Sequence, residues 1–371
     1  MPTYPETTII QGLARVQRER RLPPQAIPRP VHIVAGQTVD AVTVVLAGDI
    51  LKRYRILDVG AFFDIRQAQK AAELIEVSEG QRIQVGQELA RRGKGRRAKS
   101  MLSPVDGQVV RIEDSRIIIQ ARERTVEIQA KIPGELVSVE PNAVQVAGNG
   151  AIIQCAWGNG QFAFRPYRFL PDEGFVGLSK LDVRISEFRH VVIISPAPIT
   201  KGDLLVAQQQ DVAGVVAPSM ASNLREFAMQ LTFPVLLTEG FGQRRPTELI
   251  YTLLQSNMGR QAAFDAAVPD PWSKDRPEIV IPLPSGGTLP PRPALDQPVA
   301  VGARVRIIRA PGYGRIGEVV ALPDAPQVVG SGLRLPCARV KLPNERVVVV
   351  PLANLELLGQ TVGPSRADQR T

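Results

Sequence analysis

The sequence predicts a mainly β protein of several domains with one α/β unit. Short runs of alternating apolar and polar residues, rich in β-branched side chains, recur along most of the chain and are separated by turn residues. Gly (31) and Pro (32) are more numerous than a helical protein would carry. Strands and helices alternate repeatedly within residues 180–266. Because 371 residues exceed one ordinary core, we expect two to four domains.

Residues 299–359 predict a small barrel. Two strands, 304–309 and 316–322, flank a tight turn containing Gly312 and Gly314, and further strands follow at 340–342 and 347–351. The run VGARVRIIRAPGYGRIGEVV (301–320) resembles a KOW motif, which occurs in NusG-type transcription factors and several ribosomal proteins. The resemblance implies an SH3-like barrel that contacts RNA, a ribosome or RNA polymerase, without catalysis.

Arginines of this module form a candidate nucleic-acid contact. Two of them share one strand face by their period-two spacing, and two flank the glycine turn. Guanidinium groups in a stripe suit phosphate contact, although a solvated barrel surface or a protein contact is the alternative. The predicted nucleic-acid-binding residues here are Arg304, Arg306, Arg309 and Arg315.

Residues 31–130 contain two similar strand–turn–strand segments, 34–42 and 78–86. The run EGQRIQVGQEL (79–89) and the return run SPVDGQV (103–109) resemble the barrel-sandwich hybrid of biotinyl and lipoyl domains. This resemblance implies two quasi-equivalent hairpins that pack face to face, with glycines at their turns. The unmodified version of such a domain is used as a structural adapter, and this is the form expected here.

The hairpin between these halves is strongly basic. In carrier domains it presents the lysine that receives lipoate or biotin, but counting from Gly86 and Gly107 places Arg96 there, so no cofactor is expected. The dense positive charge predicts an extended finger that contacts phosphate, with a solvated loop as the alternative. Its basic residues are Arg91, Arg92, Lys94, Arg96, Arg97 and Lys99.

Residues 180–266 predict a three-stranded parallel βαβαβα unit. The expected strands are 188–195, 212–217 and 234–237, and the expected helices are 201–210, 222–231 and 246–257. The runs AGVVAPS (213–219) and PVLLTEG (234–240) resemble the swivelling phosphohistidine domain of phosphoenolpyruvate-utilising enzymes. Residues 219–223 lack the histidine that such a domain requires, so phosphotransfer is not expected.

Polar residues follow the predicted parallel strands at their carboxyl ends. Ligands of open parallel sheets bind at that edge, so these residues mark a candidate pocket, a protein-docking site or a purely structural edge. They are Ser195, Ser219, Ser222, Thr238 and Glu239.

Composition limits the remaining chemistry. Two cysteines and two histidines exclude a Cys/His zinc site, and unpaired thiols favour a reducing, cytoplasmic location. No apolar run is long enough to span a membrane, and no Ser/His/Asp set or phosphate loop indicates an enzyme. No catalytic residue and no metal ligand is therefore assigned. Formal net charge of +9 favours an anionic partner.

These patterns predict seven parts and one function. The parts are a basic arm (1–30), the barrel-sandwich hybrid (31–130), a β-rich small barrel or extension (131–179), the α/β unit (180–266), a Pro-rich linker with a short strand (267–298), the KOW-like barrel (299–359) and a tail (360–371). We expect a non-enzymatic adapter that binds nucleic acid or a ribonucleoprotein or transcription machine, together with protein partners. The alternative is a protein–protein scaffold without nucleic-acid contact.

Overall fold

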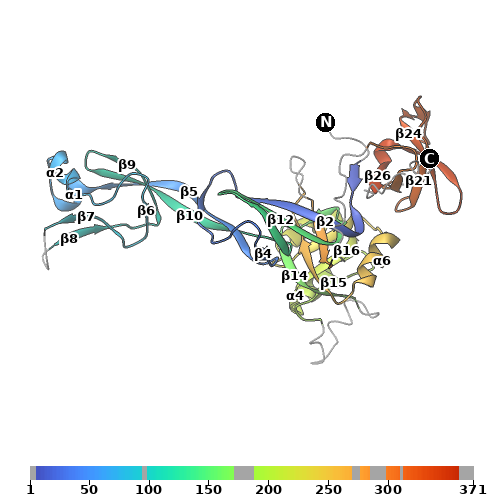
Figure 1. Cartoon of the computed structure of the whole chain (residues 1–371), viewed down its shortest axis with the longest axis horizontal. Coiled ribbons are helices and arrows are strands. Elements are labelled where there is room, and N and C mark those ends of the chain that lie inside the picture. Colours follow the sequence, from blue (N-terminus) through green and yellow to red (C-terminus); the bar gives the residue numbers. More distant parts are fainter. Residues whose placement is uncertain are drawn as a thin grey trace.

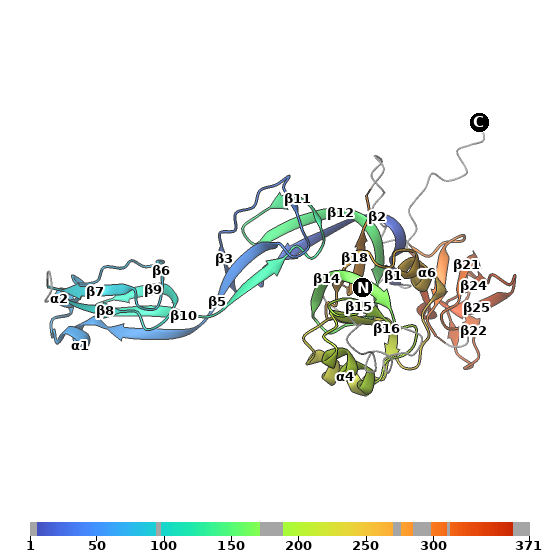
Figure 2. The ribbon, with the colours of Figure 1, turned by 90° about the horizontal axis from the view of Figure 1, so that it is seen from below.

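The computed structural model describes residues 6–93, 98–170, 188–269, 276–284, 298–309 and 312–358. It is mainly β, with 48% strand and 13% helix, as the sequence predicts. The molecule is elongated, with a distal lobe at one end of a long two-stranded arm, a central domain, and a barrel at the opposite end (Figures 1 and 2). The expected tail (360–371) lies outside the described residues, as do 285–297 and 270–275 of the expected linker.

One half of the central sheet is parallel and forms the α/β unit. All seven residues of its middle strand, β16, are buried, which is typical of a strand covered on both faces. The order of this part is β13-β17-β16-β15-β14, with β13 antiparallel at the edge. The strands are β13 (Trp157–Gly158), β14 (Phe162–Phe169), β15 (Val192–Ile194), β16 (Gly214–Met220) and β17 (Val235–Phe241).

Helices cover both faces of this parallel half. Helices α4 (Lys201–Gln209) and α5 (Arg225–Met229), the latter preceded by the 3₁₀ turn η3 (Ser222–Leu224), pack with Ile193, Val215 and Leu237. Helix α6 (Glu248–Ser256) packs on the opposite face, with the neighbouring residues Val192, Val216 and Leu236. Successive side chains of a strand point to opposite faces of the sheet, so adjacent apolar residues of each strand contact helices on opposite faces. Each predicted strand and helix of the unit has its counterpart here.

The other half of the central sheet is antiparallel and combines segments that are far apart in the sequence. It contains β18 (Gln261–Asp265), β19 (Glu278–Pro282), β12 (Ala143–Gln154), β11 (Gly134–Val139) and β4 (Thr38–Val39), with β2 (Ile10–Arg21) paired to β12. Residues 131–169 are thus part of the same sheet as the α/β unit, and form an extension of it.

Two segments expected to lie outside the domains are strands of this sheet. The expected basic arm contributes β2, whose Ala14 and Val16 are buried and whose Arg18 pairs with Glu278 at 2.5 Å. The expected Pro-rich linker contributes β19, which lies between β18 and β12 and is buried over Glu278–Ile281. The short strand expected within the linker is thus present as β19, whereas residues 10–21 of the expected basic arm form a strand of the sheet.

A long ribbon connects the central domain to the distal lobe. Strands β5 (Val44–Asp58) and β10 (Arg116–Gln129) pair along their lengths, with β-bulges at 121–124, and β3 (Ala26–Arg29) pairs with the inner part of β5. The segment expected as one domain, 31–130, is therefore divided. Its first strand–turn–strand segment lies in the central sheet as β4, and only the second lies in the distal lobe.

The distal lobe comprises residues 58–116 and has its own apolar core, including Leu89, Met101 and Val109. Two short helices, α1 (Val59–Phe63) and α2 (Ala68–Ala72), open it. Its strands are β6 (Arg82–Ile83), β7 (Glu88–Arg92), β8 (Lys99–Leu102) and β9 (Gly107–Glu113). Strands β7 and β8 form the basic hairpin at the tip, and β6 and β9 continue the sheet of β10.

The C-terminal domain, for which the name barrel is kept from the prediction, is a six-stranded sheet in the order β1-β26-β20-β21-β24-β25. It takes its first strand from the N-terminus of the chain, because β1 pairs in parallel with β26. Its elements are β1 (Glu6–Thr8), β20 (Arg304–Ile307), β21 (Ile316–Ala321), β24 (Cys337–Lys341), β25 (Val347–Pro351), η4 (Leu352–Asn354) and β26 (Leu355–Leu358), with a side hairpin of β22 (Gln327–Val328) and β23 (Arg334–Leu335).

We predict that Gly107→Ala destabilises the distal lobe by about 1–3 kcal/mol. A Cβ at this position would lie 2.3 Å from the backbone oxygen of Gln120, so the pairing of β9 with β10 would have to shift. Denaturant unfolding with hydrogen exchange of the lobe amides measures the effect. The control is Gly202→Ala in α4, where the nearest atom lies at 3.7 Å and the change stabilises by up to about 1 kcal/mol. Equal exchange in the two variants would contradict the prediction.

Candidate functional site

A groove on the C-terminal barrel gathers three arginines over an apolar floor. Arg309 follows β20, Arg315 precedes β21 and Arg346 precedes β25, so three separate turns supply them. The groove has a volume of about 230 Å³. Its remaining lining comes from Ile307, Gly312, Leu342, Val348, Val349, Val350, Pro351 and Asn354.

The glycine turn shapes one wall of this groove. Gly312 and Gly314 have φ values of 99° and 78°, which a residue with a Cβ rarely adopts. The turn reverses the chain between β20 and β21 and thereby brings Arg309 and Arg315 to the same groove. The two arginines that flank the turn in the sequence thus lie on one groove.

The groove is positively charged without internal compensation. None of its lining residues is acidic. Within the described residues, the guanidinium groups of Arg309, Arg315 and Arg346 make no hydrogen bond or ion pair, and all three side chains are solvent-exposed. Each planar guanidinium therefore keeps its donors available for an anion, and phosphate oxygens match the geometry of those donors.

The other two barrel arginines of the prediction are separated by the fold. Arg304 is exposed at the start of β20, opposite Glu318, whereas Arg306 is only 5% exposed. The period-two argument assumed a strand with one solvated face. Since the barrel is packed against the central domain, Arg306 is buried there and is not available to nucleic acid.

Arg306 holds two buried carboxylates from different parts of the chain. Its Nη1 donates to Oε2 and Oε1 of Glu239 at 3.1 and 3.2 Å, and its Nε and Nη2 donate to Oε2 of Glu356 at 2.8 and 2.5 Å. Glu239 belongs to β17 of the central domain and Glu356 to β26 of the barrel. Burial alone would lower the pKa of Arg306, but the charges of Glu356 and Glu239 outweigh it and raise the pKa.

Further polar groups complete this network. Thr247 donates to Oε1 of Glu239 from its Oγ1 at 2.7 Å and its backbone N at 3.1 Å, and the Tyr313 hydroxyl donates to Oε2 at 3.2 Å. Arg244 donates to that hydroxyl at 3.0 Å and stacks on its ring, with 4.5 Å between the guanidinium carbon and the ring centroid. Burial, followed by the charge of Glu239, raises the pKa of Tyr313 to about 12. Thr8 of β1 donates to Glu356.

The residues predicted at the carboxyl ends of the parallel strands serve mostly to hold loops and the barrel. The Oγ of Ser195 donates to the backbone oxygen of Ala197, and the Oγ of Ser219 both donates to and accepts from the backbone of Arg244. Ser222 is exposed at the start of η3. Thr238 is buried, and its Oγ1 has no hydrogen-bond partner among the described residues. Glu239 is part of the Arg306 network.

The basic hairpin is only partly described. Lys94, Arg96 and Arg97 lie outside the described residues, whereas Arg91, Arg92 and Lys99 stand on β7 and β8. Two of these three fasten the hairpin to α1: Arg92 donates to the backbone oxygen of Phe63 at 2.5 Å, and Lys99 donates to that of Phe62 at 3.0 Å. The Lys99 ammonium also lies 4.6 Å from the Phe62 ring centroid. Arg91 pairs with Glu88 at 3.6 Å.

Sequence reasoning missed one groove residue and one whole cluster. Arg346 lies between the strands expected at 340–342 and 347–351, but nothing in the sequence pairs it with the distant glycine turn. The second omission is a set of arginines at the joint of the arm and the distal lobe, which come from three separate segments.

The described part of the chain contains two thiols but no candidate metal cluster. No group of three or more His, Cys, Asp or Glu side chains there is arranged to hold a metal ion. Cys155 and Cys337 are free and buried, and burial raises the pKa of both thiols. Among the described helices, none is long and apolar enough to cross a membrane.

No family model matches the sequence, and no curated protein or solved structure is significantly similar to the chain.

We predict that Arg306→Met destabilises the docking of the barrel by about 3–5 kcal/mol, because Glu239 and Glu356 lose their shared cation while they stay buried. Denaturant unfolding together with hydrogen exchange of β20 and β26 measures the effect. The matched control is Arg304→Met, an exposed position where the change stays within about 0.5 kcal/mol. Adding Glu239→Gln and Glu356→Gln to Arg306→Met should recover part of the loss, and no recovery would argue against an electrostatic cause.

Proposed function

We propose that this protein is a non-enzymatic adapter that binds nucleic acid through the groove of its C-terminal barrel. The observation that carries the proposal is the set of three exposed arginines, Arg309, Arg315 and Arg346, which lack partners in the described structure and share one groove without an acidic residue. Side chains so placed gain most from a partner that carries closely spaced negative charges, and a phosphate backbone is such a partner.

The lining of the groove supports backbone contact over base recognition. The described lining residues include no aromatic side chain on which a base could stack. The nearby Tyr313 is engaged with Arg244 and Glu239. We therefore propose binding that tolerates many sequences and depends strongly on salt. The resemblance of residues 301–320 to a KOW motif agrees with this function. Because KOW modules contact RNA, ribosomes or RNA polymerase, we propose a partner of this type.

A second basic surface at the opposite end of the molecule supports the role of adapter. The hairpin of β7 and β8 lies at the tip of the distal lobe, far from the barrel (Figures 1 and 2). An elongated protein with a basic surface at each end is suited to span two places on a large anionic assembly. We propose a cytoplasmic location, in keeping with the free thiols and such partners.

A protein scaffold is the second candidate, and the barrel surface supplies the observation that favours it. Val347 and Val349 of β25 are about half exposed, and Val349 lines the arginine groove. Arginines next to exposed apolar side chains are also common at protein interfaces. In this alternative the groove would accept an acidic protein segment in place of a phosphate backbone.

The decisive test replaces the three groove arginines by serine, Arg309→Ser, Arg315→Ser and Arg346→Ser. We expect the variant to lose most of its affinity for mixed-sequence RNA and duplex DNA. The slope of log affinity against log salt should fall by about 2–3, because each lost phosphate contact contributes roughly 0.9 on DNA. Fluorescence anisotropy across a salt series measures both quantities.

The matched control removes the same charge from the same barrel at exposed positions outside the groove: Arg304→Ser, Arg334→Ser and Arg339→Ser. It should keep most of the affinity if the groove is the site. Equal losses in the two triple variants would show that the net charge alone acts. If the unmodified protein binds neither RNA nor DNA, the nucleic-acid proposal is wrong and the protein scaffold is favoured.

The distal hairpin needs its own variant, because Arg92 and Lys99 also hold the lobe together. We predict that Lys94→Ser, Arg96→Ser and Arg97→Ser together lower the salt dependence of binding further. Thermal unfolding of the variant checks that the protein is folded. If this variant binds with the same affinity and salt dependence as the unmodified protein, the nucleic-acid contact is limited to the barrel.

A further inference from the structure

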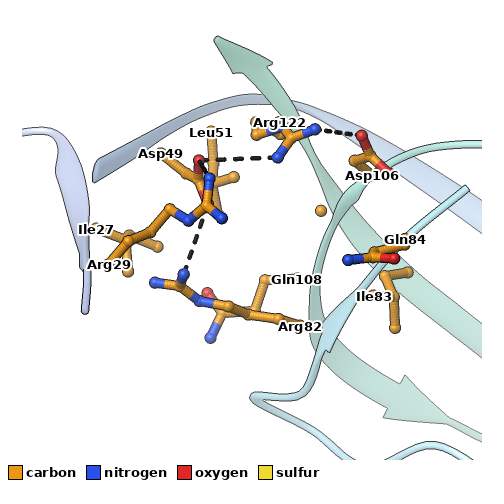
Figure 3. Close-up of a pocket in the computed structure, with 11 residues that line it drawn as sticks. Ile27, Arg29, Asp49, Leu51, Arg82, Ile83, Gln84, Asp106, Gln108 and Arg122 are labelled. Carbon is orange, nitrogen blue, oxygen red and sulfur yellow. Dashed lines mark hydrogen bonds and ion pairs between the residues drawn. The ribbon is translucent and has the colours of Figure 1, made fainter. Parts of the chain in front are cut away.

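Three arginines converge where the arm meets the distal lobe. Arg29 ends β3, Arg82 begins β6 and Arg122 lies in β10. Figure 3 shows their guanidinium groups gathered around Asp49 of β5, with Asp106 on the far side of Arg122. The cluster therefore joins β3, the ribbon of β5 and β10, and the distal lobe, which are distant in the sequence.

The ion pairs at Asp49 are long. Its carboxylate oxygens lie 3.8 Å from Arg29, 3.6 Å from Arg82 and 3.9 Å from Arg122. These separations exceed hydrogen-bonding distance, and the hydrogen bond to this carboxylate comes from the hydroxyl of Thr125 at 3.0 Å. Asp49 thus attracts three cations without using their N–H donors.

Many of those donors remain open toward a cavity. Arg82 uses its Nη2 for the backbone oxygen of Pro28 at 2.6 Å, and Arg122 uses its Nη2 for Asp106. Within the described structure, the guanidinium of Arg29 makes no hydrogen bond. The side chains of Arg29 and Arg82 are 43% and 41% exposed, so a solute from water can reach them.

The cavity matches a small anion in charge and size. Three guanidinium groups face two carboxylates, Asp49 and Asp106, which leaves one uncompensated positive charge. The cavity measures about 90 Å³, and the amide side chains of Gln84 and Gln108 also line it. Since one water needs about 10–15 Å³ of space measured in this way, the cavity has room for several waters or one tetrahedral oxyanion.

We propose that this cavity binds a phosphate group, held by Arg29, Arg82 and Arg122. Guanidinium groups bind phosphate oxygens with paired N–H donors, and the charge of the group would satisfy the uncompensated cation. The source is either inorganic phosphate or the phosphate of an ester or nucleic acid. The inference concerns a different site from the barrel groove and does not depend on the function proposed for that groove.

The test measures phosphate binding by isothermal titration calorimetry at constant ionic strength. The background is the full chain carrying Arg309→Ser, Arg315→Ser and Arg346→Ser, so that the barrel groove cannot contribute. We expect saturable binding of one inorganic phosphate per chain and competition by sulfate but not by chloride. Arg82→Gln in this background should weaken binding at least tenfold, because it removes a cation from the distal lobe side of the cavity.

Arg111→Gln is the matched control, since this exposed arginine of the distal lobe does not line the cavity. It should bind phosphate as the background does. Absence of saturable binding, or equal binding in the Arg82→Gln and Arg111→Gln proteins, would overturn the proposal.

Asp49→Asn separates an anion site from a purely internal ion cluster. Loss of the central carboxylate raises the positive charge of the cavity, so phosphate affinity should increase severalfold if the phosphate binds there. Weaker binding by a folded Asp49→Asn protein would overturn the proposal, and Arg82→Gln remains decisive if this variant does not fold. Displacement of phosphate by a short single-stranded oligonucleotide would assign the site to a nucleic-acid phosphate, and no displacement would assign it to a free anion or small ester.

Discussion

The buried guanidinium of Arg306 is the interaction on which the arrangement of barrel and central domain depends. It binds Glu239 of the central sheet and Glu356 of the barrel, and Thr8 of the first strand binds the same Glu356. A buried cation with two carboxylates is stable only while all partners are present, because each carboxylate alone would lose its hydration without compensation. The two ends of the chain and its middle are thereby fixed at one place.

This network changes what the edge of the parallel sheet can do. In many α/β proteins a carboxylate in the position of Glu239 would face a ligand. Here its two oxygens accept hydrogen bonds from Thr247, Arg306 and Tyr313, which use the acceptor capacity of the group. The edge therefore supports the barrel. The groove on that barrel has the opposite character, with cations that lack carboxylates, and this contrast places the candidate site on the barrel.

The sequence predicted those elements that depend on residues close together in the chain. The parallel unit, the glycine turn at Gly312 and the strand at 278–283 follow from apolar periodicity and turn residues, and the fold retains them. Pairing between distant segments could not be predicted in this way. The residues around Arg18 do not predict its ion pair with Glu278, and the sequence of β20 does not predict the ion pair of Arg306 with Glu239. The candidate site was predicted for Arg309 and Arg315, but Arg346 joins them only because the turn between β24 and β25 lies beside the same groove.

The long arm sets the relation between the two basic ends. Strand β5 has 15 residues, which at about 3.4 Å per residue gives a ribbon of about 50 Å. The β-bulges at 121–124 interrupt this ribbon beside Arg122, and bulges increase the local twist and bend of a strand. The arginine cavity lies at this point, with Arg29 on the inner arm and Arg82 on the distal lobe. A bound phosphate would connect the two across the bulge, and it would thereby couple the direction of the distal hairpin to the charge balance around Asp49.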